Sequence, residues 1–241
     1  VPPPICPDCG SHYIRYFGTG TEKVEETVRE FFENTTIERL DLDTAKNNRE
    51  INRIIGNFSK GRTDILIGTQ LVAKGLDFKN VGLVGVVSAD VSLNVPDYRS
   101  TERTFQLVTQ VAGRAGRGGE EGLVIVQSYT PDNFALTTAA EHDYKKFFDM
   151  EIKIREFMDY PPFSDLILVE FTSEDETEAI ETAEKCKEYL IRCKIEGKGE
   201  NIFAPKLSTN FKGKESFRYY ILIKCPKGFR NKYIYYIDTF G

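Results

Sequence analysis

The first 130 residues alternate between helix-like and strand-like spacing of hydrophobic positions. Apolar residues at i, i+4, i+7 and i+8 predict a helix over 21–33, with Thr19 and Glu22 at capping-box spacing at its start. A similar spacing predicts another helix near 51–58. The residues on these two helix faces are Val24, Val28, Phe31 and Phe32, and then Ile51, Ile54, Ile55 and Phe58.

Strand-like runs separate the helices. They cover 13–17, 37–42, 65–67, 83–87 and 123–126. The last three are continuous apolar runs, which are typical of strands covered on both faces. A helix over about 99–112, carrying Phe105, Val108 and Val111, lies between the last two runs. This βαβ order predicts an α/β class with a mostly parallel sheet. A RecA-like lobe is one fold that fits, although periodicity alone does not select it.

After Pro131 the pattern is helical to about residue 159, and Tyr160–Phe163 then breaks the chain, because proline does not continue a helix. We predict a domain boundary at this break. The elements expected beyond it are a strand at 166–171, a helix at 175–193, a short strand near 202, a strand at 217–224 and a helix at 228–238. These are five of the six elements of a ferredoxin-like α+β unit, and the chain stops where the last strand is expected.

The composition is that of a folded protein with one large or two smaller domains. The chain has 241 residues, 29% of them charged and 12% aromatic, which excludes wholesale disorder. No apolar run reaches the roughly 18 residues of a membrane-spanning helix, and the N-terminus does not resemble a signal peptide. The net charge of −5 gives no general case for nucleic-acid binding.

Charge is distributed unevenly. Residues 206–232 carry eight basic side chains and one acid, whereas six carboxylates and no base occur in 174–184. The acidic block is interpreted as a solvated helix face. The basic block is either a solvated face or a binding surface, since aromatic residues are interleaved with it. Its basic residues are Lys206, Lys212, Lys214, Arg218, Lys224, Lys227, Arg230 and Lys232, and the aromatic ones are Phe211, Phe217, Tyr219 and Tyr220.

Cys6 and Cys9 form a C-x2-C knuckle, the spacing that lets two thiolates bind one Zn²⁺. They provide only half of a site, so the knuckle is either a zinc site with further ligands upstream or a structural turn. Cys186 and Cys193 fall on an apolar helix face and are expected in the core, about 10 Å apart and too distant for a disulfide.

The loop from Gly18 to Lys23 lies between a predicted strand and a helix, as a phosphate-binding loop does. It lacks the G-x-x-x-x-G-K-[ST] spacing of a Walker A sequence, so a glycine turn is the simpler interpretation. We find no other Walker A sequence in the 241 residues, which predicts that this chain alone carries no primary ATP site.

Two segments carry the chemistry. Thr69, Gln70 and Lys74 follow a predicted strand, at the end where α/β sheets bind ligands, and are side chains that position a nucleic-acid backbone. Arg114 and Arg117 are three residues apart at the end of the 99–112 helix, among glycines. Two guanidinium groups on one edge suit the charge of a transferring γ-phosphoryl group, although salt bridging is the plainer alternative.

The sequences Gly68-Thr-Gln-x4-Lys-Gly-x-Asp-Phe78 and Gln110-Val-Ala-Gly-Arg-Ala-Gly-Arg117 resemble motifs V and VI of superfamily 2 helicases. Together with Cys6-Pro-Asp-Cys-Gly10, Gly18-Thr-Gly-Thr-Glu22, Arg39-Leu-Asp-Leu-Asp-Thr44 and Tyr98-Arg-Ser-Thr-Glu-Arg103, they resemble the bacterial replication-restart helicases, the primosomal protein N′ family. This resemblance is collinear from about Cys6 to Tyr129 and is looser afterwards.

The resemblance implies an ATP-dependent 3′→5′ DNA helicase that acts in primosome assembly and fork restart. The site residues that it implies are Arg114 and Arg117 at the γ-phosphate; Gly75, Asp77 and Gln110 in the nucleotide cleft; Thr69, Gln70 and Lys74 on DNA; Lys212, Lys214 and Arg218 on a partner; and Cys6 and Cys9 on Zn²⁺. It further implies ATP with Mg²⁺ as ligands, partners that include branched or single-stranded DNA, single-stranded DNA-binding protein and other primosome proteins, and a cytoplasmic location.

The domain organisation that the resemblance implies has four parts. They are a remnant of a zinc-binding insertion (1–12), a second RecA-like helicase lobe (13–130), a helical connector (131–162) and a C-terminal α+β domain (163–241). The first lobe, with the Walker A and B residues, is missing, so the chain is expected to be an inactive fragment of a longer ATPase. The alternatives are a non-enzymatic module that binds DNA or protein, and a different superfamily 2 translocase.

Overall fold

The computed structural model describes residues 5, 20–41, 47–69, 72, 78, 80–113, 122–193, 201–208 and 216–240, and everything structural below refers to them. The chain divides into two compact units, residues 1–148 and 149–241. Each unit is described by itself. Within the described residues, no helix is long and apolar enough to cross a membrane.

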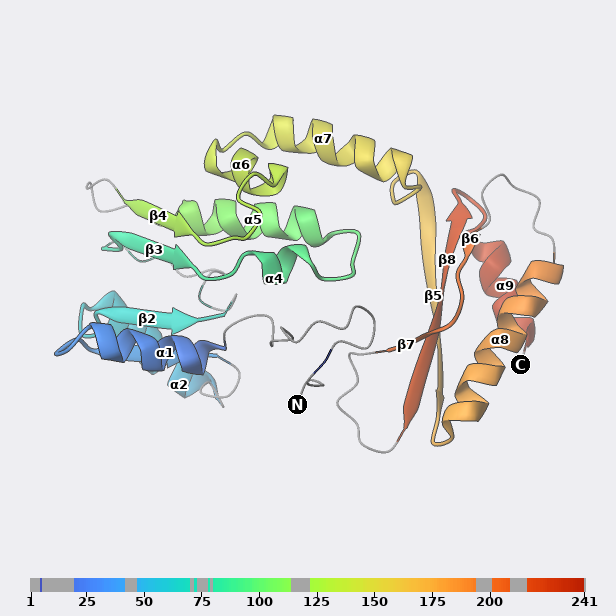
Figure 1. Cartoon of the computed structure of the whole chain (residues 1–241), viewed down its shortest axis with the longest axis horizontal. Helices are drawn as coiled ribbons and strands as arrows, with labels where there is room; N and C mark the ends of the chain where they lie inside the picture. Colours follow the sequence, from blue (N-terminus) through green and yellow to red (C-terminus); the bar gives the residue numbers. More distant parts are fainter. Residues whose placement is uncertain are drawn as a thin grey trace. The chain divides into compact units, whose positions relative to one another are not determined.

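The described part of the first unit contains two pairs of parallel strands (Figure 1). The first pair comprises β1 (Ile37–Leu40) and β2 (Ile65–Gly68), and the second comprises β3 (Leu83–Val86) and β4 (Leu123–Val126). The helices are α1 (Thr21–Phe31), α2 (Asn48–Ser59), α4 (Asp90–Leu93), α5 (Ser100–Ala112), α6 (Phe134–Ala140) and the beginning of α7 (Tyr144–Phe157). In the sequence, α2 lies between the strands of the first pair, and α4 and α5 lie between those of the second. Parallel pairing agrees with the prediction, but the described strands form two small sheets.

The core of the second strand pair follows the predicted periodicity of α5. Phe105, Val108 and Val111 are buried on one face of this helix. Phe105 stacks on Phe147 of α7, with ring centroids 4.1 Å apart. Ala135 and Leu136 of α6 belong to the same cluster. The helix therefore forms where the spacing predicts it, because its apolar face has a partner on α6 and α7.

Three predicted details of this unit are wrong. Helix α1 begins at Thr21 with Gly20 as its N-cap, whereas the predicted capping box needs residue 19 at the N-cap position. Phe31 and Phe32 are largely exposed, because the described residues place no partner on that end of the helix. The apolar runs of β3 and β4 are not covered on both faces: exposed and half-buried residues alternate along each strand.

The second unit is an antiparallel sheet with two helices on one face (Figure 1). Its described elements are β5 (Ser164–Ser173), α8 (Glu176–Arg192), β6 (Asn201–Ile202), β7 (Lys206–Leu207), β8 (Phe217–Pro226) and α9 (Arg230–Phe240). Strand β8 lies between β5 and the short strands β6 and β7. The predicted order of strands and helices is confirmed, and β7 is an addition that the sequence did not predict.

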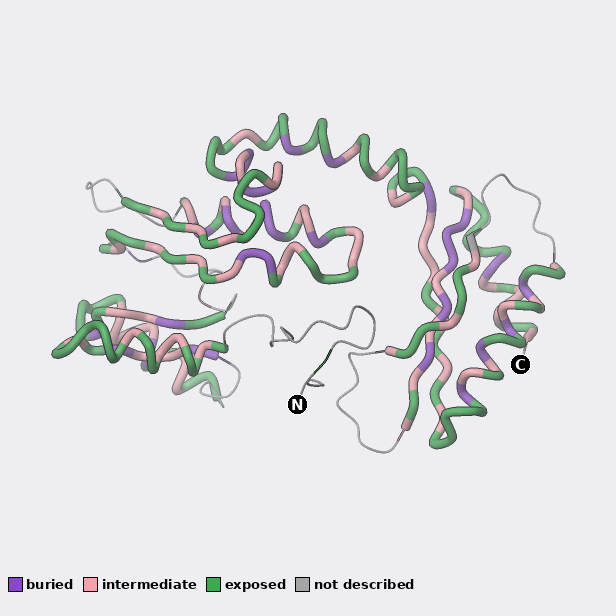
Figure 2. Tube along the Cα trace, in the orientation of Figure 1, coloured by how far each residue is buried: buried purple, intermediate pink, exposed green. Residues whose placement is uncertain are grey.

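The core of the second unit lies between the sheet and the helices (Figure 2). Every second residue of β8 from Tyr219 to Cys225 is buried there: the last three pack with Leu190 of α8 and Tyr233 of α9, and Tyr219 packs with Ala183 of α8. Cys186 is also fully buried, as predicted, whereas Cys193 is half-buried. Asp175 caps α8 by accepting hydrogen bonds from the backbone N–H groups of Thr177 and Glu178.

Candidate functional site

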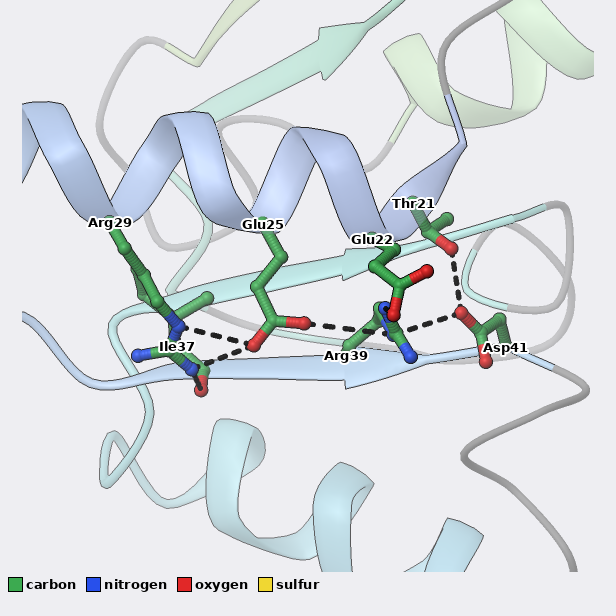
Figure 3. A network of polar contacts seen from close by, with 7 residues as sticks. All are labelled: Thr21, Glu22, Glu25, Arg29, Ile37, Arg39 and Asp41. Carbon is green, nitrogen blue, oxygen red and sulfur yellow. Dashed lines mark hydrogen bonds and ion pairs between the residues drawn. The ribbon is translucent and has the colours of Figure 1, made fainter.

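Arg39 of β1 is the centre of a charged network that fastens α1 along this strand (Figure 3). Its guanidinium lies 3.0 Å from the Asp41 carboxylate, 3.6 Å from that of Glu25 and 3.8 Å from that of Glu22. Only 16% of the Arg39 side chain is exposed, so these contacts are poorly screened by solvent. One strand arginine thus holds two successive turns of a neighbouring helix.

Arg29 and Thr21 extend the network to both ends of α1. Arg29 donates to Glu25 at 2.7 Å and to the backbone carbonyl of Ile37 at 3.2 Å. At the other end, the Thr21 hydroxyl donates to Asp41 at 2.6 Å. The N-terminus of α1 is therefore fixed beside the residue that follows β1. Alternating side chains share one face of a strand, which brings Arg39 and Asp41 to the same side.

The first candidate segment, which begins with Thr69 after β2, starts at the same sheet edge. Leu40 pairs with Gly68, so Asp41 and Thr69 follow β1 and β2 from one carboxyl edge. A Cβ on Gly68 would collide with the Leu40 carbonyl oxygen, which explains why this strand end needs glycine. Thr69 is exposed, and its carbonyl accepts the N–H of Val72 at 3.0 Å. Gln70, Lys74, Gly75 and Asp77 lie outside the described residues.

The carboxyl edge of the second strand pair carries a buried carboxylate, Asp90. It accepts hydrogen bonds from the Ser128 hydroxyl at 2.9 Å, the Tyr129 N–H at 3.0 Å and the Thr130 hydroxyl at 3.2 Å. Burial alone would raise the pKa of Asp90, but these hydrogen bonds lower it below its ordinary value. Asp90 stays ionised and ties the beginning of α4 to the segment after β4. The sequence does not indicate this site, because the partners of Asp90 lie 38–40 residues further along the chain.

Helix α5 presents charged groups at its N-terminal end. Asp97 accepts from Arg99 at 3.2 Å and lies 2.8 Å from a guanidinium nitrogen of Arg103. Desolvation would raise the pKa of Asp97, but its hydrogen bonds and the two positive charges lower it. The hydrogen bond to Asp97 and its charge raise the pKa of Arg99. Both arginines are about half exposed, so this cluster is a surface feature.

The second candidate segment follows the other end of α5. Gln110 is exposed on the last turn of this helix, three residues before Gly113. Arg114 and Arg117 lie outside the described residues, so their predicted proximity is untested. What the structure describes is helix α5, which precedes them in the chain and has Gly113 as its C-cap; the Gly113 N–H donates to the Thr109 carbonyl at 3.0 Å.

The remaining candidate residues belong to the predicted metal and partner sites. Cys6, Cys9, Lys212 and Lys214 lie outside the described residues. Arg218 is described, on β8, 3.5 Å from the Glu170 carboxylate of β5. Among the residues that the structure describes, no group of three or more His, Cys, Asp or Glu side chains is placed to hold a metal ion.

Comparison with known proteins agrees with this architecture. Residues 11–119 match the helicase conserved C-terminal domain, and this match includes β1, β2 and β3 and ends before β4. The chain thus carries the C-terminal domain of a helicase.

Relatives of this chain are named replication restart protein PriA. The chain is 43% identical to that of Bacillus subtilis over 92% of its own length, and 38% identical to those of Synechocystis sp. and Chlamydia pneumoniae over 94% and 92%. Over this shared segment the chain belongs to the PriA family. It spans 27–30% of the length of these three relatives.

Proposed function

We propose that the chain is the second motor lobe and the C-terminal domain of an ATP-dependent 3′→5′ DNA helicase. In a longer protein it would act in restart of stalled replication forks, as the names of its relatives suggest, and in primosome assembly, as the motif resemblance implies. One observation carries the proposal: Thr69 and Gln110 stand at the end of a strand and of a helix, where the two motor segments of a helicase lobe begin.

The proposed DNA contacts belong to the segment that follows β2. Thr69, Gln70 and Lys74 would hold the phosphate backbone of one strand through a hydroxyl, an amide and an ammonium group. The exposure of Thr69 and its place at the carboxyl edge, next to Asp41, support this role. The network around Arg39 would keep the edge rigid, because it fixes the N-terminus of α1 against the end of β1.

The proposed nucleotide contacts combine both segments. Gly75 and Asp77 would line the cleft, Gln110 would lie beside the nucleotide, and Arg114 and Arg117 would reach the γ-phosphate of ATP, which is bound with Mg²⁺. Guanidinium groups stabilise the charge that spreads over the phosphoryl oxygens during transfer. These roles rest on the motif sequences and on the position of α5 ahead of the two arginines.

The proposed domain organisation keeps the limits expected from the sequence: 1–12 as a zinc-site remnant, 13–130 as a RecA-like lobe, 131–162 as a connector and 163–241 as a ferredoxin-like domain. Parallel strand pairs support the lobe, and the order β5–β8–β6 with two helices on one face supports the last domain. Zn²⁺ on Cys6 and Cys9, a cytoplasmic location, and single-stranded DNA-binding protein and primosome proteins as partners complete the proposal.

An ATPase assay tests the assignment. The 241-residue chain is expected to show no DNA-stimulated hydrolysis, because no Walker A sequence occurs in it. In the full-length protein, Arg114→Ala and Arg117→Ala are each expected to reduce hydrolysis by 10³-fold or more, on the order of an arginine finger. Binding of DNA should change little.

Arg192→Ala is the matched control, since this arginine is 78% exposed on α8. It should leave hydrolysis unchanged. Turnover by the 241-residue chain would contradict the fragment assignment. Equal loss of hydrolysis and DNA binding in both arginine variants would identify them as structural residues and favour a binding module.

A further inference from the structure

The first unit contains a cavity between α5, β4 and α6, whose ribbons can be followed in Figure 1. The cavity has a volume of about 470 Å³ and is partly open to solvent. Sites that bind small molecules have volumes of about 300–1,000 Å³. Because an apolar cavity of about 150 Å³ already holds a benzene ring, this one has room for a bicyclic ring compound.

The lining of the cavity is apolar at its floor and polar at its rim. Val108 of α5 and Leu136 of α6 are buried, and Val126 of β4 is half-buried. Ala140 and His142, at the end of α6 and just after it, are exposed and form part of the rim. Of the described residues that line the cavity, none is Asp, Glu, Lys or Arg. This lining favours an uncharged, largely apolar ligand over a phosphate or a carboxylate, because no opposite charge would compensate the desolvation of an ion.

The two hydroxyl groups of the lining differ in what they can offer to a ligand. The Ser128 hydroxyl donates to Asp90 at 2.9 Å, and its oxygen accepts the N–H of Thr130 at 3.0 Å. The Thr137 hydroxyl donates to the Phe134 carbonyl at 3.3 Å, which uses its hydrogen but leaves its oxygen able to accept. Thr137 therefore suits a ligand that donates a hydrogen bond, such as a ring N–H.

His142 at the rim occupies a backbone position that usually carries glycine. Helix α6 ends in a Schellman motif, in which the His142 N–H donates to the Ala139 carbonyl at 3.2 Å and the Asp143 N–H donates to the Thr138 carbonyl at 2.9 Å. This motif gives His142 a φ of 53°, a conformation that glycine adopts without steric cost. Because the motif uses only the backbone of residue 142, it does not account for a histidine there. A role of this residue toward a ligand in the cavity does account for it.

We propose that this cavity binds an uncharged, mostly apolar ring compound, which donates an N–H hydrogen bond to Thr137 and contacts His142 at the rim. The apolar walls supply most of the affinity, and the hydrogen bond fixes the orientation of the ring. The site needs neither ATP nor DNA. It therefore goes beyond the helicase assignment and does not depend on it.

Binding of indole to the 241-residue chain tests the proposal, with benzofuran as the control compound of the same shape that lacks an N–H group. Methyl shifts of valine and leucine in ¹H–¹³C NMR spectra measure both Kd values and locate the compounds beside Val108, Val126 and Leu136. Indole is expected to bind about fivefold more tightly than benzofuran, the effect of one neutral hydrogen bond. Thr137→Val keeps the shape of the side chain and removes the acceptor, so it should raise the indole Kd about fivefold and leave the benzofuran Kd unchanged.

His142→Gly separates a role in binding from a role in the fold. Glycine suits the positive φ, so this variant should melt about 2–4 °C higher, whereas the Kd for both compounds should rise about threefold or more. A histidine with only a structural role would leave both Kd values unchanged. Asn34→Gly is the matched control, because Asn34 has a φ of 66° and is not among the residues that line the cavity. It should change neither Kd.

Ala140→Phe blocks the cavity at its rim. Ala140 is exposed on the last residue of α6, so a larger side chain there does not disturb the buried core. This variant is expected to abolish binding of both compounds. Ala204→Phe, at an exposed position of the second unit, is the matched control and should leave both Kd values unchanged. Circular dichroism checks that both variants are folded.

Three results would each overturn the proposal: no binding of indole at millimolar concentrations, equal Kd values for indole and benzofuran, or binding of indole that Ala140→Phe leaves unchanged. The first would identify the cavity as a gap in packing, and the last would place the compound elsewhere on the chain. None of these measurements involves ATP hydrolysis. Failure of this proposal is therefore distinguishable from failure of the helicase assignment, which the Arg114 and Arg117 variants test.

Discussion

The Thr21 hydroxyl donates a 2.6 Å hydrogen bond to the Asp41 carboxylate, joining residues 20 positions apart in the chain. This bond connects the first turn of α1 to the end of β1, at the edge where Thr69 also emerges. The carboxylate is almost buried and has the Arg39 guanidinium as a second partner. It therefore joins a helix to a strand at the sheet edge from which the candidate binding segment begins.

Removal of the Asp41 charge is expected to destabilise the first unit. Asp41→Asn and Thr21→Val should each lower the free energy of unfolding by about 1–3 kcal/mol, because a buried partner loses its hydrogen bond. The double variant should cost less than the sum of the two, with a coupling of at least about 0.5 kcal/mol. Urea denaturation measures all three. Strict additivity would show that the bond contributes nothing.

The hydrogen bonds of Asp90 give a pH-dependent contribution to stability. Because they lower its pKa in the folded state, the contribution is complete above the unfolded pKa of about 3.9 and is lost as the pH falls through the lower folded pKa. Asp90→Asn should therefore reduce stability at pH 7 and flatten the acid limb of a plot of unfolding free energy against pH.

Asp132→Asn, an exposed position in the same unit, is the matched control for Asp90 and should leave the curve unchanged. Chemical denaturation between pH 2.5 and 7 provides the measurement. If the loss of unfolding free energy at low pH is the same in the Asp90 variant as in the unaltered chain, other carboxylates cause that loss.

Two glycines provide opposite predictions for the same substitution. Gly68→Ala brings a Cβ against the Leu40 carbonyl oxygen and Val72, so it should cost about 1–3 kcal/mol and disturb the segment after β2. Gly56 is inside α2 and has nothing within 4 Å of its Cβ position. Gly56→Ala should therefore stabilise the chain by about 0.5–1 kcal/mol. Thermal or urea unfolding distinguishes the two, and a neutral Gly68→Ala would contradict the close approach.

The cysteines of the second unit should differ sharply in reactivity. Burial raises the pKa of the Cys186 thiol to about 11 and also raises that of Cys225, so little thiolate forms at pH 8 and access is closed. In a background of Cys6→Ser and Cys9→Ser, DTNB should label Cys193 quickly and the other two only after unfolding. Cys193→Ser should remove the fast phase. Fast labelling of Cys186 in the native chain would refute the packing of α8 on the sheet.

The periodicity of apolar residues predicted where helices and strands lie in the sequence, but not always which of their faces are buried. The spacing of Phe105, Val108 and Val111 placed α5 correctly, because the buried face of a helix repeats at a fixed interval. Apolar runs located β3 and β4, but their burial was wrong, since Leu83 and Leu123 are more than half exposed. A run of apolar residues predicts a strand, but it does not show whether one or both faces of that strand are covered by other elements.

Only those parts of the candidate site whose residues are close together in the sequence could be predicted. Motif spacing singled out Thr69 and Gln110, and the structure places both on the ends of the elements expected. Asp90 was missed, because its partners lie 38–40 residues further along and meet it only through the register of β3 and β4. The Arg39 network was missed for a similar reason, since a helix and a strand must first dock.

The long pairing of β5 with β8 has a consequence for the order of folding during synthesis. The two strands match residue for residue from Ser164–Pro226 to Ser173–Phe217, although α8 and the short strands come between them. Such distant partners close slowly, and β5 remains single until the ribosome has released β8. A nascent chain paused before residue 217 would therefore expose the apolar side chains of β5 and α8, and would be a target for chaperones.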